Sequence, residues 1–421
     1  MPRHLHHLLA QPETAADSFP LHNSTGAPPT ATCTLESDGT VKNSDDTPLD
    51  STSGRSFEER LAILRSVGEC ANQYELGPLL KKKAAPVCYV WCDVSPWMHI
   101  TQGILMALNV NKMIKAGCKV KILMADWFAW LDWKIGHIVQ ATGGDPSRMQ
   151  SVGLYNAETW RAAGMDLDGV ELVWLSDLMC RNAGEYWPLA MDIARRSDVG
   201  AIKRWLHLHA SIHTRGHGDM NPYRLRDCNA AEIFNPCLQS ACILFHKADI
   251  WLLGHEQTGA DMLARRYCDR MEMKNRPIAL FNGMPRNLLE TPELCAVDDP
   301  NWAIFMEDDE EDVISKISDG FCPPESVQGN PCLDYVKYLV LPWFGKFEVV
   351  RKGDNGASKT FVDMEEFNAD YERGALDPSD VKHALAKAIN MMLQPIRDHF
   401  GSSAEAKRLV EANEDFHLWH C

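Results

Sequence analysis

A strand-loop-helix pattern is the first candidate for chemistry in the sequence. Residues 88–103 read CYVWCDVSPWMHITQG, in which an apolar run predicts a buried strand and His99 stands near the start of a helix. Junctions of this kind hold phosphate groups on the N–H groups of the helix N-terminus. They normally contain glycines, which let the backbone approach the phosphate closely. Trp91, Pro96 and Trp97 occupy this loop instead, so the stretch is interpreted as a nucleotide site, a modified one or a former one.

Two further groups of side chains were candidates for chemistry by residue type. His209 and His213 share a helix face at i, i+4 spacing, which suits a metal pair, and His207 and His217 lie close by in the sequence. No acidic or Cys partner follows at ligand spacing, so a surface or interface cluster is favoured and no metal site is predicted. The 14 cysteines include no C-x-x-C pair and none beside a convincing His-Asp constellation. They are interpreted as reduced, buried structural thiols rather than as a nucleophile.

Composition narrows the class of protein. The chain has 421 residues, with 45% hydrophobic and 24% charged content, as expected for a globular protein of two or three domains. No run of 18 apolar residues predicts a membrane span, and the N-terminus lacks the apolar core of a signal peptide. The net charge of −16 offers no support for general nucleic-acid binding. A cytoplasmic protein with no membrane or DNA partner is therefore expected.

Three regions are expected along the chain. Residues 1–55 are rich in Ser, Thr, Pro, Asp and Gly, which predicts a disordered N-terminal extension. Residues 56–305 alternate between strand and helix patterns, and residues 306–421 are mainly helical with one small hairpin. Ser56 and Glu59 form a capping box that begins the first helix.

The middle region carries the pattern of an α/β fold. Strands are expected at PVCYVWC, CKVKILM, GVELVWLSD, ADIWLLG and RPIALFN, with helices between them. This alternation predicts a parallel, doubly wound sheet. Ligands bind at the carboxyl ends of such strands, so Cys92–Trp97 and Gly254–Thr258 are expected to face one crevice. The lysines at 81–83 are interpreted as a solvated turn rather than as an RNA-binding patch.

Three stretches extend this interpretation: MHITQG, KAGCKVKILMADWFAWL, and the long run from NPCLDYVKYLVLPWF to LQPIRDHF. Together they resemble the tyrosyl-tRNA synthetases of the archaeal and eukaryotic type, class I aminoacyl-tRNA synthetases, over about Ser56 to Glu411. The resemblance implies a Rossmann-like parallel-sheet domain over residues 56–305, with an insertion at about 170–224, and a mostly α-helical anticodon-binding domain over 306–421. It further implies ATP with Mg as cofactors of an active member. The implied partners are tRNA(Tyr) and a second subunit, in a homodimer or in a heterodimer with a related synthetase.

The ATP-binding motif of this family resembles His-Ile-Gly-His and here reads His99-Ile100-Thr101-Gln102. The resemblance implies ATP binding by His99, Thr101 and Gln102, with His99 and Gln102 as catalytic residues. Thr101, however, places a branched side chain where adenine lies flat in the family. Both glycines of the preceding family loop are replaced, by Trp91 and Pro96. Taken alone, His99 is more simply explained as a helix-capping or core histidine.

A second family signature is a mobile loop, Lys-Met-Ser-Lys-Ser, whose lysines neutralise charge on the ATP phosphates. This chain keeps the sequence that follows it, AIFMEDDEED at 303–312. The loop itself falls on Leu294, Cys295, Ala296, Val297 and Asp298. These residues include no lysine, and Asp298 would repel a triphosphate, so an ordinary surface loop is favoured.

The implied tyrosine pocket is similarly mixed. Tyr89, Gln239 and Gln257 stand at family positions, the first for the phenol and the glutamines for the ammonium group. Asn235 and Cys242 replace the Tyr and Asp of the other two positions. A Cys is a weak acceptor, so the contact that distinguishes tyrosine from phenylalanine is lost. Taken alone, Tyr89 and Gln239 are better explained by packing or capping.

The implied anticodon motif, Leu-His-Pro-Gly-Asp-Leu-Lys in the family, here reads LDPSDVK at 376–382. Asp380 is kept and is a plausible acceptor for a guanine edge. Asp377 replaces the family His, and Asn355 stands where members have an aromatic residue or His. Asp380 has an equally acceptable role as the N-cap of the next helix. Recognition of tRNA is expected to be weakened but retained.

Three functions are compatible with these residues. The first is a catalytically impaired tyrosine–tRNA ligase family protein, a pseudo-synthetase acting through tRNA or subunit binding. The second is an active ligase that forms tyrosyl-adenylate from ATP and tyrosine and then charges tRNA(Tyr). The third is a regulatory protein-interaction module. The missing lysines favour the first function over the second, and Asp377 and Asn355 mildly favour the third over the first.

Overall fold

The computed structural model describes residues 54–70, 72–131, 148–203, 230–289, 300–351 and 357–413. Several sequence expectations fall outside these ranges. They concern the N-terminal extension, the histidine group at 207–217, the loop at 294–298 and Asn355. The described residues all belong to one compact unit, residues 49–421.

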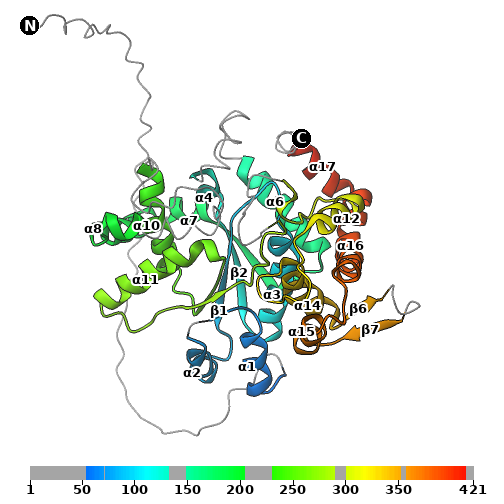
Figure 1. Cartoon of the computed structure of the whole chain (residues 1–421). Helices are drawn as coiled ribbons and strands as arrows, with labels where there is room; N and C mark the ends of the chain where they lie inside the picture. The colour runs from blue at the N-terminus through cyan, green and yellow to red at the C-terminus, as the bar shows by residue number, and fades with distance from the viewer. Residues whose placement is uncertain are drawn as a thin grey trace, which may run out of the picture. The chain divides into compact units, whose positions relative to one another are not determined.

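Five parallel strands form the sheet at the centre of Figure 1, in the order β3-β2-β1-β4-β5. They are β1 (Val87–Cys92), β2 (Lys119–Met124), β3 (Val170–Trp174), β4 (Ile250–Leu253) and β5 (Ile278–Phe281). The apolar sequences of β1, β4 and β5 suit burial on both faces, as a parallel sheet between helices requires. The predicted doubly wound sheet is confirmed. The strand order reverses between β1 and β4, so a ligand crevice belongs at the carboxyl ends of these two strands.

The predicted start of the insertion, at about residue 170, is wrong. Val170–Trp174 form β3, which pairs with β2 from Val120↔Val170 to Met124↔Trp174. Pairing with β2 provides hydrogen-bond partners for the backbone N–H and C=O groups of this segment. Outside the sheet these groups would need other partners. The segment between β3 and β4 therefore begins with α7 (Leu175–Arg181) and α8 (Ala183–Arg195).

Helices pack on the faces of the sheet (Figure 1). Besides α7 and α8 they are α1 (Phe57–Arg65), α2 (Leu76–Lys82), α3 (Met106–Lys115), α4 (Asp126–Leu131), α6 (Arg148–Ala162), α10 (Ala230–Phe245) and α11 (Thr258–Arg270). The capping box at α1 is confirmed, with the Glu59 N–H donating to Ser56 Oγ at 3.2 Å. The lysines at 81–83 are exposed to solvent, as predicted, but Lys81 and Lys82 lie in the last turn of α2 and not in a separate turn. Positive charge there complements the helix dipole.

The alternation of side chains along the strands divides the core into two layers. Val90, Ile122 and Leu252 belong to the layer that contains α3 and α6 side chains. Tyr89, Trp91 and Trp251 belong to the other layer, with side chains of α8, α10 and α11. Successive strand residues point to opposite faces, so the two aromatic residues of β1 must share one face. That face is the aromatic side of the sheet.

The C-terminal part is mostly helical, as predicted. It contains α12 (Glu310–Asp319), α13 (Pro331–Tyr335), α14 (Leu341–Phe344), α15 (Met364–Glu372), α16 (Pro378–Ser402) and α17 (Ala404–Ala412). The predicted hairpin is confirmed as β6 (Phe347–Val350) paired antiparallel with β7 (Ser358–Phe361). Leu385 and Ile389 of α16 belong to the same apolar cluster as Val90 of β1, so this part shares a core with one face of the sheet.

Polar contacts reinforce that shared core. His399 of α16 pairs with Glu158 of α6 at 2.7 Å, and Tyr155 lies with its ring centroid 5.3 Å from that of Phe400. The Arg397 guanidinium donates to the Asp308 carbonyl oxygen at 2.9 Å. No helix in the described part of the chain is long and apolar enough to cross a membrane.

Candidate active site

The loops after β1 and β4 meet at the predicted crevice. Gln257 Nε2 donates to Asp93 Oδ2 at 2.8 Å, and the Gly254 N–H donates to Gln257 Oε1 at 2.9 Å. The expectation that these two loops face one another is therefore confirmed. Gln257 is 2% exposed, and both ends of its amide bind groups of the protein itself. Its expected ammonium-binding role would require these bonds to be exchanged.

Trp91 fills the space beside this pair. Its indole lies 5.3 Å from the Phe128 ring at an angle of 18°, and 6.0 Å from that of Trp251. The indole N–H donates to Asp93 Oδ1 at 2.7 Å, and the side chain is 4% exposed. Because Asp93 also accepts from Gln257, the indole, the carboxylate and the amide form one continuous chain. We call Trp91, Asp93 and Gln257 the crevice clasp.

Tyr89 belongs to the same aromatic layer and not to an open pocket. Its ring lies 4.2 Å from that of His246 and 5.1 Å from that of Trp251. Burial, followed by Glu171 and Cys242, raises the pKa of Tyr89 to about 12. Cys242 is fully buried, and its burial raises the pKa of the thiol, so it stays protonated at neutral pH. The packing role proposed for Tyr89 agrees with these contacts.

The other two tyrosine-pocket candidates lie on α10. Asn235 and Gln239 are four residues apart, so they share one face of the helix, and both are half-buried. Asn235 Oδ1 is buried and has no hydrogen-bond partner among the described residues. Cys242, on the same helix, belongs with Tyr89 to the apolar cluster on the aromatic side of the sheet.

His99 lies at the predicted helix start but is covered. The helix opens with a π-helical turn, Thr101–Leu105, that leads into α3. The His99 N–H donates to Gln102 Oε1 at 3.0 Å, and the Thr101 N–H donates to His99 Nδ1 at 3.1 Å. Gln102 and Thr101 therefore serve the local backbone, and the imidazole proton is left on Nε2.

The ring of His99 packs against Trp302. The two ring centroids are 5.3 Å apart at 22°, and Phe305 contacts His99 edge-on at 6.0 Å. His99 is 7% exposed, and burial, followed by Lys316, lowers its pKa to about 4. The imidazole is therefore neutral at pH 7. This arrangement agrees with the core role weighed for His99, and Trp302 was not singled out from the sequence.

The segment AIFMED seals the helix start from the other side. The Ile100 N–H donates to the Ile304 carbonyl at 3.0 Å, and the Met306 N–H donates to the Met98 carbonyl at 2.8 Å. A Cβ atom at Gly103 would collide with the Met306 side chain, so Met306 packs directly against the backbone of this glycine.

Glu307 was missed by the sequence reasoning. Its Oε1 accepts from the Tyr155 hydroxyl at 2.9 Å and from the Met98 N–H at 3.3 Å. Its Oε2 is buried with no hydrogen-bond partner among the described residues. Burial raises the pKa of Glu307 to about 7, so the carboxyl group titrates near neutral pH.

Asp377 and Asp380, both expected to bind tRNA, differ in their exposure to solvent. Asp377 is exposed and caps α16, because its side chain accepts from the Ser379 N–H at 2.8 Å. Asp380 is 6% exposed and is the third residue of α16. The N-cap role suggested for Asp380 is therefore wrong. Pro378 directly follows the cap and suits the first helical position, which places the helix start three residues earlier than expected.

A groove of about 1050 Å³ runs between α12 and α16 and includes Asp377. Ile314 and Met391, both exposed, supply apolar surface, and Lys382 and Lys387 supply positive charge. The Lys382 ammonium donates to the Ser318 carbonyl at 2.7 Å and so joins the two walls. The groove therefore lies beside Asp377, one of the expected tRNA-binding residues.

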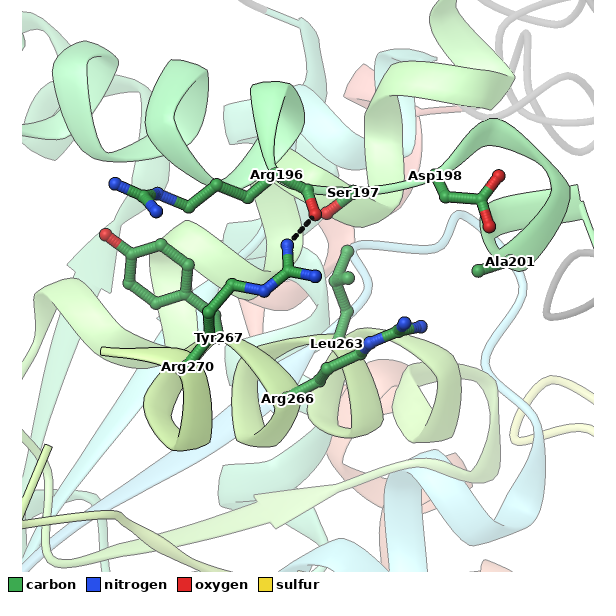
Figure 2. A pocket seen from close by; sticks show the side chains of 8 residues that line it. All are labelled: Arg196, Ser197, Asp198, Ala201, Leu263, Arg266, Tyr267 and Arg270. Carbon is green, nitrogen blue, oxygen red and sulfur yellow. Dashed lines mark hydrogen bonds between the residues drawn. The ribbon is translucent and has the colours of Figure 1, made fainter. Parts of the chain in front are cut away.

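Figure 2 shows a second depression, between α8 and α11, whose lining includes Arg196, Arg266, Tyr267 and Arg270. Its volume is about 10 Å³. Arg270 is already bonded to the Arg196 carbonyl, and the Tyr267 hydroxyl donates to Asp192 at 2.7 Å. This is a packed helix contact with no room for a substrate. Within the described ranges no group of three or more His, Cys, Asp or Glu side chains is placed to hold a metal ion.

Comparisons with known proteins connect this geometry to a family. The family model for class I tRNA synthetases (W and Y) matches residues 81–394. The chain is 45% identical over 355 residues to tyrosine–tRNA ligase 1, cytoplasmic, of Arabidopsis thaliana, covering 84% of this chain and 88% of that protein. It is 44% identical over 395 residues to tyrosine–tRNA ligase 2, cytoplasmic, of the same plant, covering 93% of this chain and 50% of that protein.

A solved structure gives the same relationship. Leishmania major tyrosyl-tRNA synthetase in complex with tyrosinol matches with a TM-score of 0.71 at 34% identity, covering 86% of this chain and 52% of that chain. The chain therefore spans about half the length of this protein and of the second plant ligase.

Proposed function

The chain belongs to the class I tyrosyl-tRNA synthetase family, and on that premise we propose that it is a pseudo-synthetase, which does not form tyrosyl-adenylate and acts by binding tRNA or a related subunit. The observation that carries this proposal is the crevice clasp. Trp91 replaces a glycine of the corresponding family loop. Its indole occupies the crevice at the carboxyl ends of β1 and β4.

Tyrosine binding would require the protein to open this clasp. Moving a buried tryptophan out of its contacts costs about 3–5 kcal/mol, on the scale of truncating it to alanine. A cost of 3 kcal/mol lowers affinity by roughly 100-fold. The family's phenol-binding position is also altered, because a buried, protonated Cys242 replaces the carboxylate.

The residues present do not fit the family's other substrate, ATP with Mg. His99 is covered by Trp302 and is neutral at pH 7, and Gln102 and Thr101 are bonded to the local backbone. The segment at 294–298, where family members carry their lysines, has none. We therefore derive no adenylation step for this chain.

A second candidate function, an active tyrosine–tRNA ligase, is favoured by one observation. Identity of 45% extends over 88% of an Arabidopsis thaliana tyrosine–tRNA ligase. For this function the clasp and the His99–Trp302 stack would both have to rearrange when substrates bind.

Tyrosine-dependent exchange of pyrophosphate into ATP by the purified full chain separates the two candidates. We expect no exchange above a control without tyrosine. Cys242→Asp alone should not restore it, because the ATP side stays covered. Robust exchange by the unmodified chain would establish the active ligase and overturn the proposal.

Direct binding of the amino acid tests the clasp itself. In isothermal titration, Trp91→Gly should bind L-tyrosine or L-phenylalanine more tightly than the unmodified chain. Trp91→Phe, which keeps a ring in the crevice, is the matched control and should not gain affinity. Equal affinity of the unmodified chain and Trp91→Gly for L-tyrosine would exclude the clasp as the cause of inactivity.

We propose that tRNA(Tyr) binding is retained and involves the α12–α16 groove. Lys382 and Lys387 supply local positive charge on an acidic chain, and Asp377 offers an exposed acceptor. Filter binding should weaken with rising salt, in proportion to the few phosphates neutralised. Replacing Lys382 and Lys387 with Gln should reduce both affinity and its salt dependence. A full chain with no preference for tRNA(Tyr) over other tRNAs would favour the regulatory module.

We also propose that the chain self-associates or joins a related synthetase subunit through the segment that begins with α7 and α8. Met191 of α8 and Val199 just beyond it are about half exposed, at 52% and 51%. Sedimentation of a strict monomer at micromolar concentration, with no co-purifying subunit, would refute this assembly. Both Arabidopsis relatives are described as cytoplasmic, and we propose the same compartment for this chain.

A further inference from the structure

Helix α6 presents two sets of side chains to two parts of the molecule. Tyr155 and Glu158 are three residues apart and share one face, which contacts α16. Asn156 and Trp160 are four residues apart and share another face, and both are fully buried. This second face is turned to the loop after β1 and to the helix start that follows it. A helix of 15 residues therefore links the C-terminal part to the crevice.

Asn156 holds the loop after β1 by its backbone. The Ser95 N–H donates to Asn156 Oδ1 at 3.1 Å, and Asn156 Nδ2 donates to the Ser95 carbonyl at 2.7 Å. One buried amide thus satisfies both backbone groups of one loop residue, and the Ser95 hydroxyl donates onward to the Trp97 carbonyl at 2.6 Å. Asp93 of the crevice clasp lies two residues before Ser95. The clasp and α6 therefore fix the same short loop from two sides.

Trp160 holds the helix start in a similar way. Its indole N–H donates to the Gln102 carbonyl oxygen at 2.7 Å, and the side chain has no exposed surface. Gln102 lies in the π-helical turn Thr101–Leu105. Turns of this kind are rare in proteins and are frequent at functional sites. Through Asn156 and Trp160, α6 thus holds both of the segments that flank His99.

Two contacts connect α16 to the other face of α6. His399 Nε2 lies 2.7 Å from Glu158 Oε1, and the two side chains are 27% and 15% exposed. The Phe400 ring centroid lies 5.3 Å from that of Tyr155. We call these two pairs the brace contacts. Since α16 also forms one wall of the α12–α16 groove, the groove and the crevice are joined through α6.

We propose that α16 is an autoinhibitory brace: the brace contacts hold α6 in place, and α6, through Asn156 and Trp160, keeps the loop after β1 and the helix start closed. When the brace contacts are released, α6 shifts, the backbone of Ser95 loses its partner, and the crevice clasp opens with the loop. This inference deepens the proposal that the clasp closes the crevice, and it rests on that proposal. It does not depend on tRNA binding or on adenylate formation.

Hydrogen exchange of the full chain, followed peptide by peptide with mass spectrometry, measures the opening of the loop without any ligand. In His399→Ala the amides of residues 93–98 should exchange about fivefold faster than in the unmodified chain, the change in opening that corresponds to one lost hydrogen bond. His399→Gln is the matched control, because its side-chain amide can donate to Glu158 in place of the imidazole, and it should exchange at the unmodified rate. A peptide that contains β4 is the internal reference and should not change in either variant.

Two further variants locate the connection. Asn156→Asp removes only the donor to the Ser95 carbonyl and should speed exchange of the same loop peptide while the brace contacts stay intact. Combining Glu158→Ala with His399→Ala should add nothing to His399→Ala alone, because both changes remove one contact. Unchanged loop exchange in His399→Ala or in Asn156→Asp would overturn the brace, and so would an equal rise in the loop and β4 peptides, which would show general destabilisation. The clasp proposal stands or falls separately, on the affinity of Trp91→Gly for L-tyrosine.

Discussion

The carboxyl group of Glu307 should make the free energy of unfolding depend on pH. Its Oε1 holds Tyr155 and the Met98 backbone at the start of the candidate site, while its buried Oε2 has no described partner. Burial raises the pKa from 4.5 to about 7 in the folded chain. Below pH 4.5 both the folded and the unfolded states bind the proton. Between pH 4.5 and 7 only the folded state keeps it, so the free energy of unfolding falls as the pH rises, and above pH 7 the loss is complete.

Glu307→Gln should remove this loss, because the amide does not ionise. From pH 5 to pH 8, urea unfolding of the unmodified chain should lose about 1–3 kcal/mol more stability than unfolding of the variant. Glu310→Gln, at an exposed position nearby, is the matched control and should follow the unmodified chain. Parallel pH profiles for Glu307→Gln and the unmodified chain would show that the carboxyl group is ordinary.

At the scale of elements, one residue at the start of α16 both caps the helix and is a candidate for contact with RNA. Asp377 caps this helix of 25 residues and also lines the groove. Asp377→Ala should lower the free energy of unfolding by about 1 kcal/mol, because a helix N–H loses its acceptor. Asp377→Asn retains an equivalent cap and should leave stability nearly unchanged. Chemical denaturation of both variants measures the difference.

The same two variants separate capping from recognition. If the Asp377 charge contributes to RNA binding, Asp377→Asn changes tRNA affinity without changing stability. Matched losses of stability in Asp377→Ala and Asp377→Asn would contradict the assignment of the cap to the side-chain oxygen.

At the scale of the whole molecule, one ion pair ties the site to the C-terminal part. The Lys316 ammonium of α12 donates to both carboxylate oxygens of Asp308, at 2.7 and 2.8 Å, with both side chains about 10% exposed or less. Arg397 of α16 donates to the carbonyl of the same Asp308. Since the apolar core is also shared, the described unit should unfold in a single transition.

Lys316→Met tests this coupling. Leaving Asp308 buried without its partner should cost about 3–5 kcal/mol. The midpoints from tryptophan fluorescence, to which Trp91 and Trp251 of the sheet contribute, and from far-UV circular dichroism should shift by equal amounts. Separate midpoints for the two signals would show that the sheet and the helical part unfold independently.

The sequence by itself determined the features that depend on neighbours along the chain. The apolar runs of β1 to β5 and the intervening helices predicted the parallel sheet, and Ser56 with Glu59 predicted the first helix start. The hairpin of β6 and β7 followed from its strand pattern in the same way. Each of these signals lies within a few residues, so local periodicity and capping chemistry suffice to predict it.

Only the tertiary structure decided what the candidate site residues do. Trp91 closes the crevice because Phe128 and Trp251 arrive from α4 and β4, and His99 is neutral because Trp302 and Phe305 cover it. Burial, stacking and pKa depend on atoms that are near in space and distant in sequence. The residue types at these positions were therefore visible in the sequence, while their environments, and hence their chemistry, were set by packing.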